Sequence, residues 1–184
     1  FGHDAVLTFE VVVCILLNWC GRWFDYFPRA PTTVLASMDE ALTAMDPGLR
    51  GHIGGVECLW PCLQTLFTEV LSRAQWVRLW DHLVTHWREP ALLPAAMVSL
   101  LKFLRPAIVA APPGEAGVKS LLAREQTLVL KVVLDNMYAL GRAAPGLAPD
   151  RPNPTAADLT PGAGGLLGTM QGLTPRGGPE RLPL

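Results

Sequence analysis

The sequence predicts an all-α fold, an array of short antiparallel helices followed by a disordered tail rich in proline and glycine. Two observations support this. Apolar residues recur at helical spacing up to about residue 140, and prolines or glycines separate these runs at short intervals. Residues 10–17 come nearest to the alternation of a strand, but their length and their neighbours favour a helix. From Arg142 onward periodicity and aromatic residues are lost, so this stretch cannot offset its ordering entropy.

Proline and capping residues mark where the predicted helices begin and end. Pro28 lacks the N–H group and the free φ that would let the first helix continue. Asp46 before Pro47 is typical of an N-cap with proline in the first turn, and Ser72 with Gln75 has the spacing of a capping box. The predicted helices span residues 4–24, 32–45, a short run from 47, 59–71, 73–87, 90–104 and 118–140.

The helix predicted at 73–87 has the clearest buried face. At 100° per residue its apolar side chains share an arc of roughly 160°, and polar side chains fill the rest. His82 and His86 are four apart on the polar face without a glutamate between them, so we expect solvated histidines rather than a metal pair. The apolar arc comprises Trp76, Val77, Leu79, Trp80, Leu83, Val84 and Trp87.

Residues 5–20 form an apolar run that could be mistaken for the core of a signal peptide or for a membrane span. Glu10 and Asn18 interrupt it, no basic leader precedes it, and it is shorter than the roughly 20 apolar residues that a span needs. A buried helix without membrane insertion is therefore expected. The end of this helix is expected to anchor a turn in the core through Trp19, Trp23, Phe24, Tyr26 and Phe27.

Composition argues against several classes of function. The net charge of −1 provides no basic surface for nucleic acid or anionic lipid. Glycine-rich phosphate loops, the serine nucleophile elbow, H-E-x-x-H and the kinase motifs are absent, so neither enzymatic chemistry nor a cofactor is expected. Tight C-x-x-C pairs are also absent, which favours reduced, buried thiols in a cytosolic protein over a zinc site for Cys14, Cys20, Cys58 and Cys62.

Two neighbouring segments carry a resemblance to a known family. The segment 60–67 reads WPCLQTLF, and the segment 76–81 reads WVRLWD. Together they resemble the pair of helices near the end of the TBC domain of Rab GTPase-activating proteins, where a Trp-led segment ending in T-L-F precedes an L-R-L-W-D-type segment. Arg78 and Asp81 are three apart on the second helix and can pair across its surface.

The first predicted helix narrows this resemblance. Its EVVV at 10–13 and NWC at 18–20, followed by WF and YFP within 23–28, look like the WD-repeat-bearing subgroup of TBC proteins. The resemblance covers about residues 9–103. The motif residues, for which mainly structural roles are expected, are Trp19, Trp60, Leu66, Phe67, Arg78, Leu79, Trp80 and Asp81.

The resemblance and the composition together predict how the chain is organised. The resemblance implies the C-terminal part of a TBC domain at 1–105, and composition and periodicity predict a Pro/Gly linker at 106–117, an additional helix at 118–141 and a disordered tail at 142–184.

The same resemblance implies a function in Rab biology. TBC domains of this family supply an arginine from I-x-x-D-x-x-R and a glutamine from Y-x-Q, both upstream of the matched region, and neither motif occurs in this chain. Two alternatives follow. The chain is a scaffold that binds a Rab-type small GTPase or other proteins without GTPase-activating chemistry of its own, or it belongs to an activator whose catalytic residues lie upstream. The subgroup further implies a cytoplasmic location, at centriolar satellites or the ciliary base.

Overall fold

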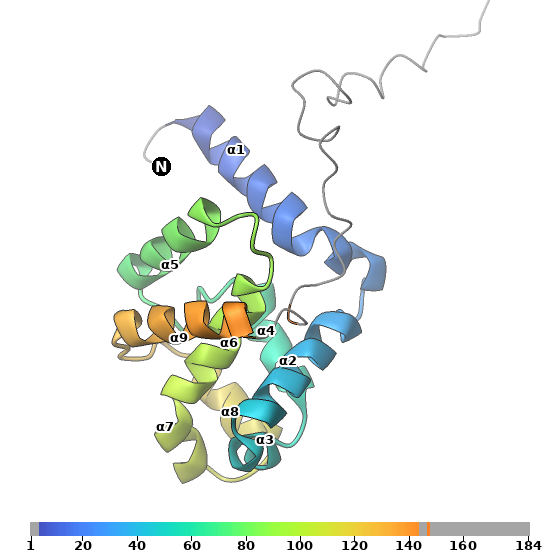
Figure 1. Cartoon of the computed structure of the whole chain (residues 1–184), viewed down its shortest axis with the longest axis vertical. Coiled ribbons are helices and arrows are strands. Elements are labelled where there is room, and N and C mark those ends of the chain that lie inside the picture. Colours follow the sequence, from blue (N-terminus) through green and yellow to red (C-terminus); the bar gives the residue numbers. More distant parts are fainter. Residues whose placement is uncertain (1–3, 144–146, 148–184) are drawn as a thin grey trace, which may run out of the picture. The chain divides into compact units, whose positions relative to one another are not determined.

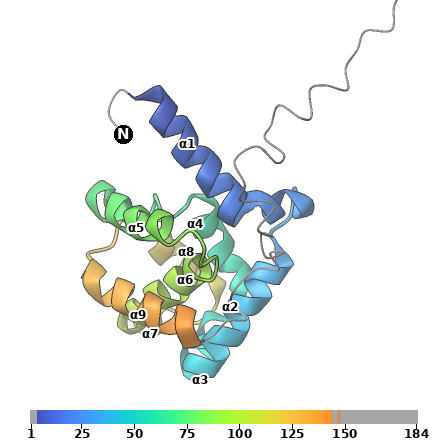
Figure 2. The same cartoon turned by 45° about the horizontal axis from the view of Figure 1, so that its top comes forward.

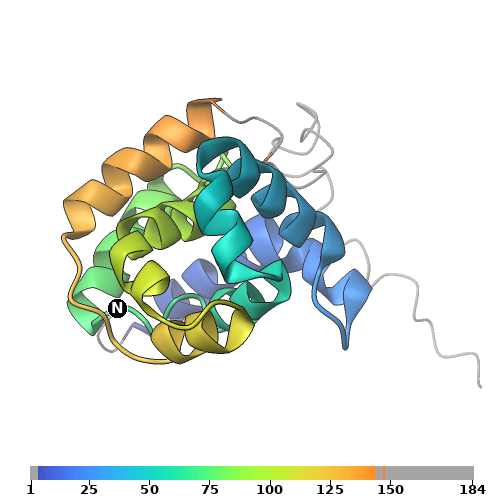
Figure 3. The same cartoon turned by 90° about the horizontal axis from the view of Figure 1, so that it is seen from below.

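Helix α6 (Leu92–Phe103) lies at the centre of the fold, and all of its residues from Leu92 to Leu101 are buried. A helix that is apolar on all sides requires neighbours on all sides. In the computed structural model, which describes residues 4–143 and 147, α9 (Leu130–Ala143) and α2 (Thr32–Met45) pack against α6 (Figures 1 and 3). The described part of the chain contains helices and no strand, which confirms the predicted all-α class.

The other elements are short, and α1, α3, α4 and α5 begin within one residue of a predicted helix start. Asp46 caps α3 by accepting a hydrogen bond from the Leu49 N–H at 2.8 Å, and Ser72 and Gln75 form the predicted capping box of α5. The remaining elements are α1 (Ala5–Ile15), the π-helical turn η1 (Leu16–Cys20), the 3-10 turns η2 (Gly21–Tyr26) and η3 (Val56–Leu59), α3 (Pro47–Ile53), α4 (Trp60–Gln64), α5 (Arg73–Thr85), α7 (Arg105–Ala110) and α8 (Glu115–Leu122).

The helix predicted at 59–71 is wrong beyond Gln64, where α4 ends. Leu66 and Phe67 have φ values of 53° and 67°, in the left-handed region that bulky residues rarely adopt. Phe67 is almost completely buried, so the packing of its ring offsets the cost of the backbone conformation. The resulting turn carries the chain from α4 to the cap of α5.

The single helix predicted at 118–140 is also wrong, because the chain forms α8 and α9 with an extended connection between them. Hydrogen bonds to distant residues hold this connection. The Gln126 N–H donates to the Val70 carbonyl at 2.9 Å, and the Gln75 side-chain amide donates to the Leu128 carbonyl at 3.0 Å. These bonds replace those that a continuous helix would make.

The stretch at 106–117 was expected to be a Pro/Gly linker, yet α7 occupies its first part. The preceding helix α6 ends at Phe103, close to the predicted end at residue 104. Pro106 lies in the first turn of α7, where its missing N–H has no helical partner to lose. Of the predicted tail at 142–184, all but Arg142, Ala143 and Leu147 lie outside the described residues.

The expectation of a buried first helix is only half right. Ile15, Trp19 and Cys20 are buried, but the other side of α1 and η1 is exposed and apolar, and α1 projects beyond the neighbouring helices (Figure 2). Ala5–Tyr26 is long and apolar enough to cross a membrane by length and composition, and 17% of its most apolar window is buried. Phe24 and Phe27 were expected in the core but are 65% and 82% exposed. The exposed apolar residues of α1 and η1 are Val6, Leu7, Phe9, Val12, Leu16 and Leu17.

Candidate functional site

A cluster of tryptophans joins η1, the turn after α4 and α5. Trp80 is buried, and the edge of its ring meets Trp19 with centroids 5.7 Å apart and planes at 86°. Trp76 lies on the other side of Trp80 with centroids 6.1 Å apart. Edge-to-face pairs of this kind stabilise a fold by about 0.5–1.5 kcal/mol beyond the area they bury. The cluster therefore attaches the end of the N-terminal helical segment to α5.

The left-handed turn at Leu66 provides a hydrogen-bond acceptor for the tryptophans of this cluster. Its carbonyl accepts a hydrogen bond from the Trp76 indole N–H at 2.7 Å and lies 3.4 Å from the Trp80 indole nitrogen. Buried indole N–H groups need such partners. The sequence signal for this arrangement was the order of the T-L-F and W-D segments, although the turn between them was not foreseen.

The other predicted motif residues lie around the cluster. Trp60 is half-buried and meets Trp23 edge-on, with centroids 5.0 Å apart. Phe67 and Leu79 are buried in the core. Arg78 and Asp81 are exposed, and no ion pair joins them within the described residues. They border two different grooves, one on each side of α5.

The first of these, the α1–α5 groove, has apolar walls. It encloses a cavity of about 260 Å³. Val11 and Ile15 of α1 form one wall, and the α5 wall carries the only polar side chains of the lining, Asp81 and Thr85. The remaining lining residues, all from α5, are Trp76, Val77, Trp80 and Val84.

The second, the α5–α9 groove, is larger and carries more polar and charged side chains. It has a volume of about 590 Å³, and its charged residues include Arg78 of α5 and an ion pair on α9 between Lys131 and Asp135 at 2.7 Å. The rest of the lining comprises Ala74, Gln75, His82, Leu128, Val129, Leu130, Leu134 and Tyr138.

The helical wheel predicted solvated side chains for His82 and His86, but both imidazoles contact Tyr138 of α9. His82 Nδ1 lies 2.8 Å from the Tyr138 hydroxyl, and His86 Nδ1 lies 3.2 Å from the same hydroxyl and 2.9 Å from the His82 carbonyl oxygen. Both imidazoles are half-buried because α9 covers this side of α5. Burial, and then the charge of Glu89, raises the pKa of Tyr138, so its hydroxyl keeps its proton and can donate to an imidazole.

None of the four cysteines lines either groove. Cys14 of α1 is half-buried, and the other three are buried in the core. Burial raises the pKa of Cys20 and of Cys62 to about 12 and that of Cys58 to about 11. Such thiols stay protonated and unreactive at neutral pH. Within the described residues no three His, Cys, Asp or Glu side chains are grouped so that they could hold a metal ion.

Known relatives match about half of the chain. It is 39% identical over 93 residues to TBC1 domain family member 31 of Oryzias latipes, 36% over 106 residues to that of Xenopus laevis, and 33% over 104 residues to that of Homo sapiens. Over this half, the chain is similar to TBC1 domain family member 31. The resemblance inferred from residues 60–67 and 76–81 is thereby confirmed.

The matches cover 47%, 55% and 54% of this chain but only 8% to 10% of the relatives' own length. No family model matches the chain, and no solved structure matches it. The name of these relatives is that of the TBC1 domain family, which agrees with the resemblance of residues 60–67 and 76–81 to a TBC domain.

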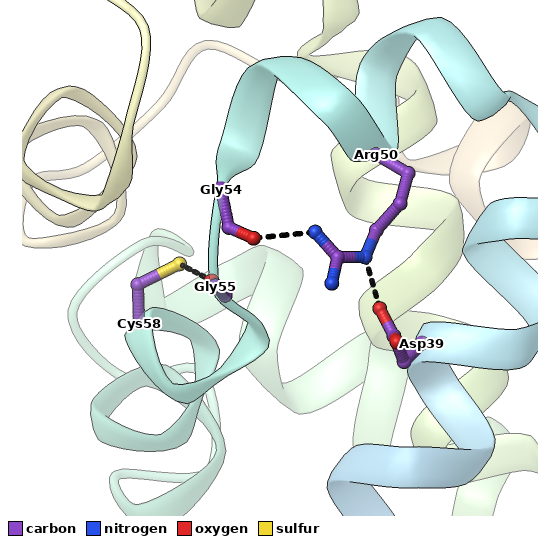
Figure 4. Close-up of polar contacts among 5 residues, drawn as sticks. All are labelled: Asp39, Arg50, Gly54, Gly55 and Cys58. Carbon is purple, nitrogen blue, oxygen red and sulfur yellow. Dashed lines mark hydrogen bonds and ion pairs between the residues drawn. The ribbon is translucent and has the colours of Figure 1, made fainter.

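Several arginines of the chain are held in structural contacts. Arg50 of α3 donates to the Asp39 carboxylate and to the Gly54 carbonyl, while the Cys58 thiol donates to the Gly55 carbonyl at 3.0 Å (Figure 4). In this way Arg50 ties α2 to the end of α3. Two further arginines are paired with carboxylates, Arg22 with Asp25 at 2.9 Å and Arg105 with Asp46 at 2.6 Å.

Proposed function

We propose that this chain is a TBC-type module that binds a Rab-family GTPase or another protein, and that it does not itself supply the GTPase-activating chemistry. Stimulation in trans requires an arginine that is preorganised at the γ-phosphate, an effect worth about 10³–10⁵ in rate. The observation that supports the proposal is how the arginine side chains are bonded and exposed. Arg50 is held by Asp39 and Gly54, whereas Arg78 is exposed on α5 and lies outside the family's finger motif.

Exposed apolar surface supports a role in protein binding. Phe9 of α1 is 66% exposed and Leu17 of η1 is 70% exposed, on a side of the helix where apolar residues predominate. Contiguous apolar surface of this kind marks interaction sites. A scaffold role uses this surface and requires no catalytic residue.

The alternative function is that of a Rab GTPase activator whose arginine and glutamine lie in upstream sequence. One observation favours it, because the matched segment is about a tenth as long as the relatives. In a longer protein the present helices would complete a TBC domain whose catalytic half precedes them. A cytoplasmic location at centriolar satellites or the ciliary base, with partners found there, is likewise part of the proposal and rests on the resemblance to the subgroup.

A single-turnover assay tests the proposal. GTP-loaded Rabs are mixed with an excess of the full chain, and hydrolysis and binding are measured separately. We expect binding of at least one Rab without acceleration of hydrolysis. A rise of about a hundredfold or more, lost when Arg29, Arg73 or Arg78 is changed to Ala, would contradict the scaffold function, since it would identify a working finger.

A further inference from the structure

The α1–α5 groove has the shape of a site for a helix. Its two walls are rows of side chains spaced four apart, Val11 and Ile15 on α1 and Val77, Asp81 and Thr85 on α5. Rows at this spacing form the ridges between which a third helix packs. The groove remains partly open, because Val77 in its lining is 42% exposed.

The cavity within the groove fits a side chain better than a separate small molecule. Its volume of about 260 Å³ is below the roughly 300–1,000 Å³ of typical ligand pockets. Trp76, Trp80 and Val84 make its surface apolar. A buried apolar anchor residue surrounded by weaker contacts is the usual centre of a protein interface.

The negative charge of Asp81 indicates which kind of helix would bind in the groove. Asp81 is the only charged residue of the lining, it is exposed, and no ion pair engages it within the described residues. Arg73, one turn before Val77, does not line the cavity. An occupant with a lysine or arginine beside its apolar anchor would therefore complement Asp81.

We propose that the α1–α5 groove binds an amphipathic helix of a partner protein, with apolar residues in the cavity and a lysine or arginine against Asp81. The proposal rests on the function proposed above, that of a protein-binding module, and specifies the chemistry of the partner. A second copy of this chain fits less well. Its exposed apolar helix has Glu10 as the only charged residue from Ala5 to Gly21, so it offers no cation to Asp81.

A displayed library of helical peptides tests this inference. The peptides carry apolar residues at i, i+3/i+4 and i+7 and Lys, Glu or Gln at the flanking positions, and they are selected on the full chain. We expect the bound peptides to be enriched in flanking Lys. Asp81→Asn should weaken the selected peptides by about two- to fivefold, as loss of an exposed ion pair does, and Asp81→Lys should shift selection toward Glu.

Matched variants show where the peptides bind. Val77→Lys should abolish binding, whereas Val132→Lys, at an exposed valine of α9 outside both groove linings, should not change it. Circular dichroism establishes that both variants fold. The inference is overturned if no peptide is selected, if flanking charge has no effect, if Val77→Lys still binds, or if sedimentation shows that the groove holds a second copy.

The two proposals can fail independently. Peptides that fail to bind, with Rab hydrolysis not accelerated, would refute only the groove. Accelerated hydrolysis with groove-dependent peptide binding would refute only the absence of GTPase-activating chemistry.

Discussion

The two sides of α5 differ in the helices that cover them. Toward α1 the side chains are apolar apart from Asp81 and Thr85, and the neighbouring helix leaves an open groove. Toward α9 they are polar, and His82 is nevertheless half-buried against Tyr138. The comparison shows that the apolar stripe of a helix does not by itself decide which residues are buried. A neighbouring helix can cover the polar side, and another can leave part of the apolar side exposed.

The largest effect is expected from the centre of the apolar side. Trp80→Ala should lower the free energy of unfolding by about 3–5 kcal/mol, as deletions of large buried aromatic side chains do. Urea unfolding followed by circular dichroism measures this. Val77→Ala, at an exposed position of the same side, should change stability by less than about 0.5 kcal/mol. Similar losses from both changes would mean that the α1–α5 groove is closed rather than open.

A smaller effect is expected from the polar side. Tyr138→Phe removes the hydroxyl that lies 2.8 Å from His82 and 3.2 Å from His86, and should cost about 0.5–1.5 kcal/mol. Tyr26→Phe is the control, since the Tyr26 hydroxyl lies 3.2 Å from Thr33 Oγ1 at an exposed site and should matter less. If the two changes have equal effects, the contact between α5 and α9 does not depend on the histidine–tyrosine bonds.

The smallest effect concerns the two charged residues that the sequence suggested as a pair. Arg78→Ala and Asp81→Ala should each change the free energy of unfolding by less than about 0.5 kcal/mol, because both side chains are exposed. Their effects should add within about 0.3–0.5 kcal/mol, because they border different grooves. A double-mutant cycle measures the coupling, and a larger value would show that the residues interact across α5.

Local sequence predicted those features that depend on neighbouring residues. The caps at Asp46 and Ser72 and the buried positions of Leu79, Trp80 and Leu83 all follow from spacing along one helix. The same reasoning predicted the all-α class, since no run of the described residues needed a strand partner to bury its apolar face.

The incorrect predictions involve contacts between residues far apart in the chain. The helix over 118–140 is interrupted because Gln126 and Leu128 bond to Val70 and Gln75, which no local pattern reveals. His82 was placed in solvent because its partner, Tyr138, lies on another helix. For the candidate site, the sequence indicated Trp80 and Asp81 but not the grooves beside them, since a groove depends on the position of a second helix.

The shared carbonyl of Leu66 also bears on the order in which the chain can assemble. Trp76 and Trp80 are 10 and 14 residues from Leu66, whereas Trp19 and Trp80 are 61 residues apart in the sequence. Closing a loop loses chain entropy that grows with its length, by about 0.6 kcal/mol for each doubling. The turn and α5 can therefore join at a lower entropic cost than α1 and α5, which makes them the more accessible nucleus on which the N-terminal helix docks later.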